Sequence, residues 1–149
     1  MTANAAWEAL LAAHSALMKD FAAHDIWEDI SMKEYDVLYT LSKCPSGGIS
    51  LTELHRHVLL SQPALSRMVD RLAGRGLVER CVDPADRRGL RLSLTSAGRA
   101  LQRRIGRRHA RDVAVAVSGS LTFDEIRQLE AISRKLAGAA EIQNRPDWT

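Results

Sequence analysis

Hydrophobic side chains recur every three or four residues along most of this chain, but in residues 77–94 the period changes to two. A spacing of three to four residues predicts an amphipathic helix, and strict alternation predicts a half-exposed strand. The alternation is clearest in Leu90-Arg-Leu-Ser-Leu94, and a turn-forming run at residues 83–89 separates it from an apolar strand at residues 77–82. The chain is therefore predicted to be mainly α-helical with a small β-hairpin.

Two helices are predicted before residue 45. The first covers residues 5–24, where large side chains recur on one side of the helix. This stripe consists of Trp7, Leu10, Leu11, His14, Leu17, Met18 and Phe21. Ser31 and Glu34 have the spacing of a capping box, which opens a second helix that stops in the Cys44-Pro-Ser-Gly-Gly48 run. Its predicted inner face is Tyr35, Leu38 and Tyr39, with Leu41 as a further candidate.

A short helix and a longer one are predicted before the hairpin. A second capping-box spacing, at residues 50–53, opens a short helix that runs to about Val58. A tight turn follows, Ser61 caps a fourth helix, and Gly76 ends it. The buried face of the fourth helix is predicted to be Leu65, Met68, Val69 and Leu72. A short helix, a turn and a second helix followed by a β-hairpin form a winged helix-turn-helix.

Two more helices follow the hairpin. The fifth is predicted from Ser96 to about Val117, and Ser118-Gly-Ser120 is expected to break it. A capping-box spacing at residues 122–125 opens the sixth. One side of the sixth helix carries Ile126, Leu129, Ile132 and Leu136. Because no linker or repeat interrupts this order, a single domain is expected over residues 1–149.

Arginine is concentrated in the middle of the chain. The net charge is only +3, but residues 56–111 contain 14 arginines and 4 acidic residues, and the segments on both sides are net acidic. The planar guanidinium suits phosphate groups and guanine edges. A basic block inside a folded domain indicates a polyanionic partner, so nucleic acid is favoured over a merely solvated basic face.

The fourth helix is the candidate DNA-recognition helix. Since its apolar residues point inward, its outer face is predicted to carry Gln62, Ala64, Ser66, Arg67 and Arg71. Glutamine can pair with adenine, and arginine with guanine, in the major groove. Ser61, at the helix N-terminus, can bind a phosphate together with free backbone N–H groups. The alternative is a surface helix with scattered polar residues.

The hairpin tip carries Asp86, Arg87 and Arg88. An arginine at the end of a rigid ribbon can enter the minor groove, whereas the alternative is a solvated turn. Asp86 is expected to orient a neighbouring arginine or to pair with Arg71 or Arg75. The fifth helix is also rich in arginine, and these side chains are expected to contact phosphates or to pair with acids of the first helix or of a partner subunit. They are Arg99, Arg103, Arg104, Arg107, Arg108 and Arg111.

Residues 61–98 read SQPALSRMVDRLAGRGLVERCVDPADRRGLRLSLTSAG, and this run resembles the core of the MarR (multiple antibiotic resistance regulator) family. The resemblance covers the recognition helix, the wing and the entry to the fifth helix, and the flanking helices match in length and order. It implies a transcriptional regulator, a repressor more often than an activator, that binds a pseudo-palindromic operator as a homodimer. It also implies that Arg88 is the minor-groove arginine and Asp86 its supporting acid.

The segments outside the winged module predict a dimerisation region. A winged helix-turn-helix at about residues 31–95 accounts for only part of the chain, and the apolar stripes of the first and last helices lie outside it. By the resemblance, helices at about residues 5–25 and 96–140 form the dimer. Two modules about one DNA turn apart would match two half-sites.

Regulators of this family usually respond to a signal, and the first hypothesis is a small aromatic or anionic ligand held between the dimerisation and DNA-binding parts. Its candidate lining is Trp7, His14, Met18, Trp27, Tyr35 and Tyr39. The alternative for these side chains is core packing.

Redox and metal sensing are the other two hypotheses. Cys44 and Cys81 are far apart in the sequence, and the peroxide-sensing branch of the family has a cysteine near the start of the first helix, where this chain has none. The five histidines are too scattered in sequence to predict a metal site. We therefore expect no metal and no cofactor.

No motif for catalysis is present: the sequence has no nucleophile elbow, phosphate loop or dinucleotide fingerprint. A winged-helix module that binds a protein instead of DNA is the alternative class, but it would not need arginines at both the recognition helix and the wing tip. No apolar run is long enough to span a bilayer and the N-terminus lacks a basic leader, so a cytoplasmic protein without a membrane partner is expected.

Overall fold

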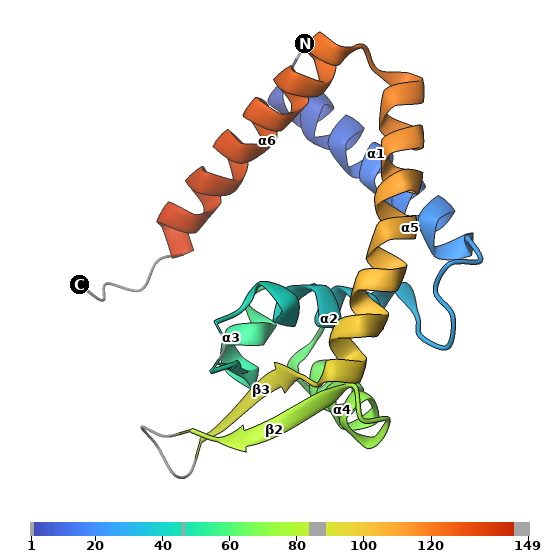
Figure 1. Ribbon diagram of the computed structural model, residues 1–149. Coiled ribbons are helices and arrows are strands. Elements are labelled where there is room, and N and C mark those ends of the chain that lie inside the picture. Colours follow the sequence, from blue (N-terminus) through green and yellow to red (C-terminus); the bar gives the residue numbers. More distant parts are fainter. Residues whose placement is uncertain (1, 46, 84–88, 145–149) are drawn as a thin grey trace. The chain divides into compact units, whose positions relative to one another are not determined.

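The computed structural model describes residues 2–45, 47–83 and 89–144 (Figure 1). Its elements, in chain order, are α1 (Ala3–Ala23), α2 (Met32–Lys43), β1 (Ile49–Ser50), α3 (Leu51–His55), α4 (Gln62–Gly74), β2 (Val78–Val82), β3 (Leu90–Leu94), α5 (Ser96–Ser120) and α6 (Phe123–Asn144). The chain forms two compact units, Met1–Ala110 and Arg111–Thr149. The prediction of a mainly helical winged helix-turn-helix with a small β-hairpin is confirmed.

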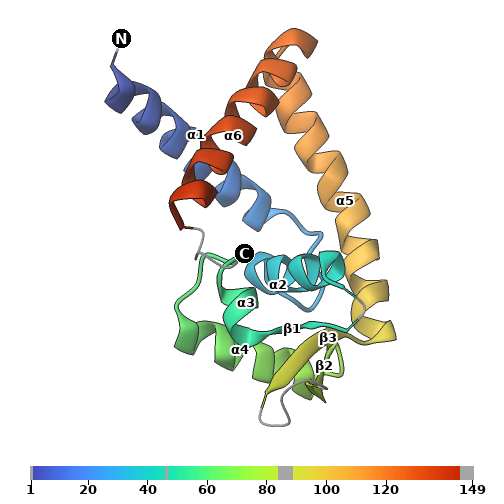
Figure 2. The ribbon, with the colours of Figure 1, turned by 90° about the vertical axis from the view of Figure 1, so that its left-hand side faces the viewer.

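The wing hairpin belongs to a three-stranded antiparallel sheet with the order β1-β3-β2. Figure 2 shows β1 between α2 and the hairpin, and Ile49 pairs with Leu92 of β3. Two residues are too short to give a periodic signal, so the sequence did not reveal β1. Gly48 enters this strand with φ +73°, and a Cβ there would lie 2.5 Å from the carbonyl oxygen of Leu92. Only glycine fits this position without strain.

The core of the winged module lies between α2, α3, α4 and the sheet. Its fully buried side chains include Val37, Leu38, Leu54, Leu65, Val69 and Leu72. Tyr39 is a correction, because the sequence placed it on the inner face of α2 and the structure leaves it 45% exposed. The helical period instead brings Val37 inward beside Leu38, and Leu41, the further candidate for this face, is buried.

Helices α1, α3 and α5 differ at their ends from the predicted ones, α1 only slightly. Helix α3 stops at His55 and not at about Val58, because the N–H groups of Arg56 and His57 donate to the carbonyls of Glu53 and Leu54 in a tighter turn. The ring Nε2 of His55 also donates to the carbonyl of Leu60 (2.8 Å). Helix α1 covers Ala3–Ala23, close to the predicted 5–24. Helix α5 continues to Ser120, past the predicted break at residues 118–120. The Leu121 N–H donates to the Val117 carbonyl (2.9 Å), so the helical bonding carries across this segment.

An aromatic cluster joins the end of α1 and the following loop to α2 and α5. The ring of His109 lies 5.2 Å from the ring of Phe21, 5.2 Å from that of Trp27 and 5.8 Å from that of Tyr35. The indole N–H of Trp27 donates to the carbonyl of Phe21 (2.8 Å). The cluster holds the loop before α2 in place, and this loop contains Glu28 and Asp29.

Among the helices that the structure describes, none combines the length and the apolar composition needed to cross a membrane.

Candidate nucleic-acid interface

Helix α4 has one buried and one exposed side. Leu65, Met68, Val69 and Leu72 are all buried, as predicted. Of the predicted outer residues, Gln62, Arg67 and Arg71 are exposed, whereas Ala64 and Ser66 are half-buried. The helix therefore offers a polar edge on a rigid apolar base.

The N-terminus of α4 is capped by its own sequence. The hydroxyl oxygen of Ser61 accepts the N–H of Ala64 (3.4 Å), and Pro63 occupies the first turn, where a backbone N–H would have no helical partner. Ser61 is exposed and retains its hydroxyl proton for donation to an anion. A capped helix N-terminus with an exposed hydroxyl is a suitable phosphate contact.

Arg71 and Arg75, near the C-terminal end of α4, contact α2 and the loop before α2. The Nε of Arg71 lies 3.5 Å from Oε1 of Glu34 on α2, and Nη1 of Arg75 donates to the backbone carbonyl of Asp29 (2.7 Å). The sequence suggested Asp86 as a partner for these arginines, but residues 84–88 lie outside the described part of the chain. The prediction that Asp86, Arg87 and Arg88 form a wing-tip contact is therefore neither supported nor contradicted.

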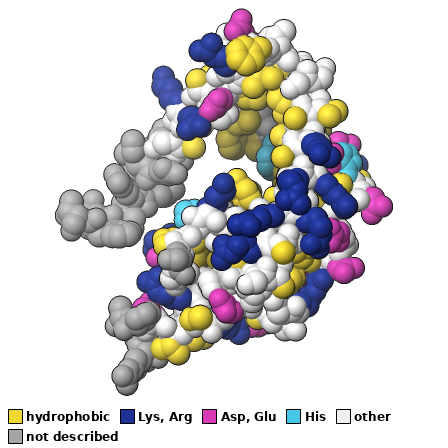
Figure 3. All heavy atoms as spheres, in the orientation of Figure 1, with side chains coloured by type: hydrophobic (Ala, Val, Ile, Leu, Met, Phe, Trp, Pro, Cys, Tyr) yellow, Lys and Arg dark blue, Asp and Glu magenta, His cyan; other side chains and the backbone are white. Residues whose placement is uncertain are grey.

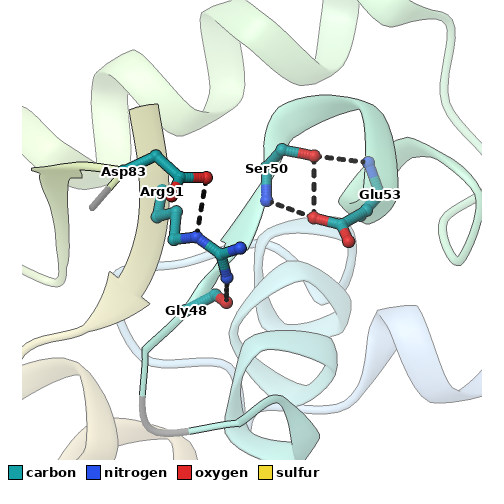
Figure 4. Close-up of polar contacts among 5 residues, drawn as sticks. All are labelled: Gly48, Ser50, Glu53, Asp83 and Arg91. Atoms are coloured by element: carbon teal, nitrogen blue, oxygen red, sulfur yellow. Dashed lines mark hydrogen bonds and ion pairs between the residues drawn. The ribbon is translucent and has the colours of Figure 1, made fainter. Parts of the chain in front are cut away.

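The base of the wing is tied to the sheet by one arginine. Arg91 on β3 donates from Nε to Oδ2 of Asp83 (2.9 Å) and from Nη1 to the carbonyl of Gly48 (2.8 Å), as Figure 4 shows. The Asp83 N–H also donates to the Gly89 carbonyl (2.9 Å), which closes the hairpin below its tip. The same view shows the Ser50–Glu53 capping box that starts α3. These hydrogen bonds therefore fix the two wing strands as far as Asp83 and Gly89.

Two arginines of α5 pair with one acid. Figure 3 shows Lys and Arg side chains gathered over the half of α5 nearer the sheet. Arg104 makes a two-point contact with Glu28 (2.9 and 2.8 Å), and Arg108 lies 3.8 Å from the same carboxylate. The hydrogen bonds from Arg104 lower the pKa of Glu28 below its usual value. The expected partner was an acid of the first helix or of a partner subunit, but Glu28 lies in the loop after α1.

A groove of about 740 Å³ lies between α1, α2 and the turn after α3. Three of the predicted effector contacts, His14, Met18 and Tyr39, line it, together with Met32 and Leu60. Trp27 and Tyr35 belong instead to the buried aromatic cluster, and Trp7 is 58% exposed and does not line the groove. The structure thus brings together only half of the predicted ligand contacts.

Cys44 lacks the environment of an activated thiol. Burial raises the pKa of Cys44, and its thiol donates to the carbonyl of Thr40 (3.2 Å). Cys81 is exposed on β2. Within the described ranges, no three histidine, cysteine or acidic side chains converge as metal ligands.

The sequence did not reveal that Glu34 and Glu28 are partners of arginines on this surface. Glu34 was recognised as a capping residue, but its second role as the partner of Arg71 depends on how α2 packs against α4. Glu28 has a backbone φ of 55°, and no sequence motif marked it as the partner of α5. Both contacts join residues far apart in sequence, for which a single sequence gives no signal.

Comparison with known proteins identifies the family of this arrangement. The MarR family model matches residues 30–90. The multiple antibiotic resistance protein MarR of Salmonella typhimurium (strain LT2) is 33% identical over 108 residues, which are 72% of this chain and 74% of that protein.

Two solved structures extend the similarity to nearly the whole chain. Sco3205, a MarR family transcriptional regulator from Streptomyces coelicolor solved in complex with DNA, has a TM-score of 0.78 and 27% identity, covering 93% of this chain and 89% of that one. The PcaV transcriptional regulator from Streptomyces coelicolor, solved with its natural ligand, has a TM-score of 0.68 and 30% identity, covering 95% of both chains. The chain therefore belongs to the MarR family and is a DNA-binding transcription regulator, not an enzyme.

Proposed function

We propose that this protein is a sequence-specific repressor that binds a pseudo-palindromic operator as a homodimer. Helix α4 lies in the major groove, with Gln62, Ser66 and Arg67 directed at base edges, and Ser61 and Arg71 contact phosphates. The wing lies in the adjacent minor groove, where Arg88 is the inserted side chain, Asp86 is its supporting acid and Arg87 is a further DNA contact. A dimer that covers a promoter excludes polymerase, and the protein acts in the cytoplasm, beside the DNA it regulates.

The observation that carries this proposal is the polar edge of α4. Gln62, Arg67 and Arg71 are exposed, while the opposite side of the same helix is buried, so this edge is free to meet a groove. Sco3205, which has the same fold, was solved with DNA. A protein-binding winged module would have no need of this basic edge.

The dimer is proposed from the apolar side chains of α1 and α6. Trp7, Leu10 and Leu11 of α1 are 58%, 40% and 47% exposed. On α6, Ile132 and Leu136 are 58% and 55% exposed. Apolar stripes of this size are stable in water when a second surface covers them. We therefore assign the helices at about 5–25 and 96–140 to the dimerisation region.

The groove between α1, α2 and the turn after α3 is the proposed effector site. Its apolar residues Met18 and Met32 suit a flat hydrophobic molecule, and Lys19, Lys33 and His57 suit an acidic group on it. PcaV was solved with its natural ligand. A small aromatic acid that fills this groove would release the operator by favouring a conformation that does not fit DNA.

Fluorescence anisotropy tests the DNA-binding proposal. The probes are a duplex selected by the protein from a random-sequence pool and an unselected duplex of equal length, each titrated at several salt concentrations. The selected duplex should bind about 10³-fold or more tightly than the unselected one, and both affinities should fall as salt rises.

Two variants locate the interface. Arg67→Gln should weaken operator binding and relax the preference at one base pair in each half-site, at a cost of about 1–3 kcal/mol per contact. Arg134→Gln removes the same charge from α6, where the Arg134 side chain is 80% exposed and pairs with Glu130, and it should leave binding unchanged. Equal binding of selected and unselected DNA by the wild type would contradict the proposal.

A further inference from the structure

Glu34 of α2 is unusual for an acid, because it is buried and its side chain contacts Arg71 of the recognition helix α4. The residue is 9% exposed. Its Oε2 accepts two hydrogen bonds from the start of α2, one from the backbone N–H of Ser31 (2.9 Å) and one from the hydroxyl of Ser31 (3.1 Å). These two bonds fix the carboxylate, and its other oxygen, Oε1, faces α4.

Arg71 forms an ion pair with this fixed oxygen, and its Nε is the nearest guanidinium nitrogen. The Nε of Arg71 lies 3.5 Å from Oε1 of Glu34, whereas the Arg71 side chain as a whole remains 58% exposed. The guanidinium carries five N–H donors in a rigid fork, so the Nη groups remain available to another acceptor. Arg71 is therefore anchored at its inner edge and open at its outer edge.

The place of Arg71 on α4 favours a phosphate as that acceptor. The N-terminal residues of a recognition helix reach base edges, and Arg71 lies in the third turn of α4. Phosphate contacts carry no sequence information themselves, but they set the register and orientation of the protein on the duplex. An arginine held in one position sets that register more narrowly than a freely rotating one.

We propose that Glu34 is a positioning residue for operator recognition, which holds Arg71 as a phosphate clamp and so sets the register of α4 in the major groove. This inference rests on the proposed DNA-binding function and adds to it a residue that does not touch DNA. The opposing expectation is simple electrostatics: an acid near DNA repels phosphates, so removing it should strengthen binding to every duplex.

The Glu34→Gln variant separates these two expectations. Glutamine also completes a capping box, so α2 should still start at Ser31. The affinity for the selected duplex should fall about 3- to 10-fold while the affinity for unselected DNA does not fall, so that discrimination between the two is lost in the same proportion. The matched control is Glu125→Gln, which neutralises the capping-box acid of α6, for which the described residues show no arginine contact. It should change neither affinity.

A double-variant cycle tests whether Glu34 acts through Arg71. Arg71→Gln should weaken binding to both duplexes and reduce the salt slope by about 1 per half-site, as the loss of a phosphate contact does. Adding Glu34→Gln to it should cause no further loss of discrimination. Thermal unfolding of each variant, followed by circular dichroism, provides a check that the proteins remain folded.

Four outcomes overturn the inference. Tighter binding of Glu34→Gln to both duplexes would leave only charge repulsion, and additive losses in the double variant would place Glu34 in a separate role. Unchanged discrimination in Glu34→Gln, with a wild type that does discriminate, would overturn the inference and leave the proposed function intact. A wild type that does not discriminate would overturn both.

Discussion

Helices α4 and α1 both carry apolar stripes, but the two stripes have opposite surroundings. On α4, Leu65, Val69 and Leu72 are 0% exposed and Met68 is 6% exposed. On α1, Phe21 alone is buried, and Trp7 and Leu11 are about half exposed. Burial of such side chains is worth about 1.5–3 kcal/mol each. The DNA-binding region therefore completes its core within one chain, whereas α1 leaves a surface that a second chain would complete.

The largest expected effect comes from disrupting the exposed apolar surface of α6, which we assign to the dimerisation region. Ile132→Glu places a charge in the exposed apolar stripe of α6, where Ile132 is 58% exposed. The protein should become monomeric, and operator affinity should fall by about 10³-fold because the two half-sites no longer bind together. Sedimentation equilibrium and anisotropy measure the two quantities.

Arg134→Glu is the control for this substitution. It changes a residue two positions away on α6, which helical geometry turns from the side that carries Ile132 and Leu136. It should leave both the dimer and operator affinity in place. A dimeric Ile132→Glu protein would remove α6 from the dimerisation region.

The next effect concerns the completed core of the winged module. Leu72→Ala deletes a side chain that is fully buried on α4, and it should lower the free energy of unfolding by about 3 kcal/mol. Leu11→Ala deletes the same atoms from the exposed stripe of α1. Its effect should appear mainly as a melting temperature that depends more steeply on protein concentration, since it weakens association.

Chemical denaturation at several protein concentrations compares the two leucine variants. The loss in Leu72→Ala should be present at every concentration, because it arises within one chain. Equal and concentration-independent losses for both variants would show that α1 is packed within its own chain, and the contrast drawn above would then fail.

The sequence predicts this structure well where the contacting residues are close in sequence and poorly where they are distant. The α4 core and the hairpin were predicted to the residue or nearly so, because local spacing alone determines which side of a helix or strand is apolar. The caps at Ser31 and Ser50 were predicted for the same reason, since both partners lie three residues apart. Local patterns were informative wherever the partner was near in sequence.

Features that depend on distant partners were not predicted. Strand β1 has two residues and exists because Ile49 pairs with Leu92. The effector lining was predicted from residue type, and the structure places only His14, Met18 and Tyr39 of that set along the groove. Aromatic side chains suit both a core and a ligand site, so their type could not separate Trp27 and Tyr35 from the groove.

A smaller effect tests how closely the sheet packs against the start of α5. A Cβ on Gly98 would lie 1.9 Å from the carbonyl oxygen of Leu77, so Gly98→Ala should force the helix away and cost about 2 kcal/mol of unfolding free energy. Gly74→Ala is the control, since among the described residues a Cβ at that position would meet no atom within 4 Å beyond its own stretch of helix. It should be neutral or slightly stabilising, because alanine favours helix. Thermal unfolding followed by circular dichroism measures both, and equal losses would indicate a backbone effect instead of close packing.

The smallest effect compares two arginine–glutamate contacts, one in each unit. Hydrogen bonds from Arg104 hold the pKa of Glu28 below its ordinary value of 4.5, so the folded state is favoured while this carboxylate is ionised. The contribution should be complete above pH 4.5 and should disappear as the pH falls through the lowered folded-state value. Glu28→Gln should therefore destabilise the protein at neutral pH, by less than Leu72→Ala or Gly98→Ala, and should approach the wild type in acid.

Glu130→Gln is the control. It breaks the exposed contact with Arg134 on α6 and should have almost no effect at any pH, because solvent screens a surface pair. Urea denaturation across pH 3–7 compares the two variants. Equal responses would mean that the contact of the loop after α1 with α5 adds nothing to the stability of the DNA-binding region. The aromatic cluster and the hydrogen bond from Arg75 to the Asp29 carbonyl would then be sufficient to hold the loop.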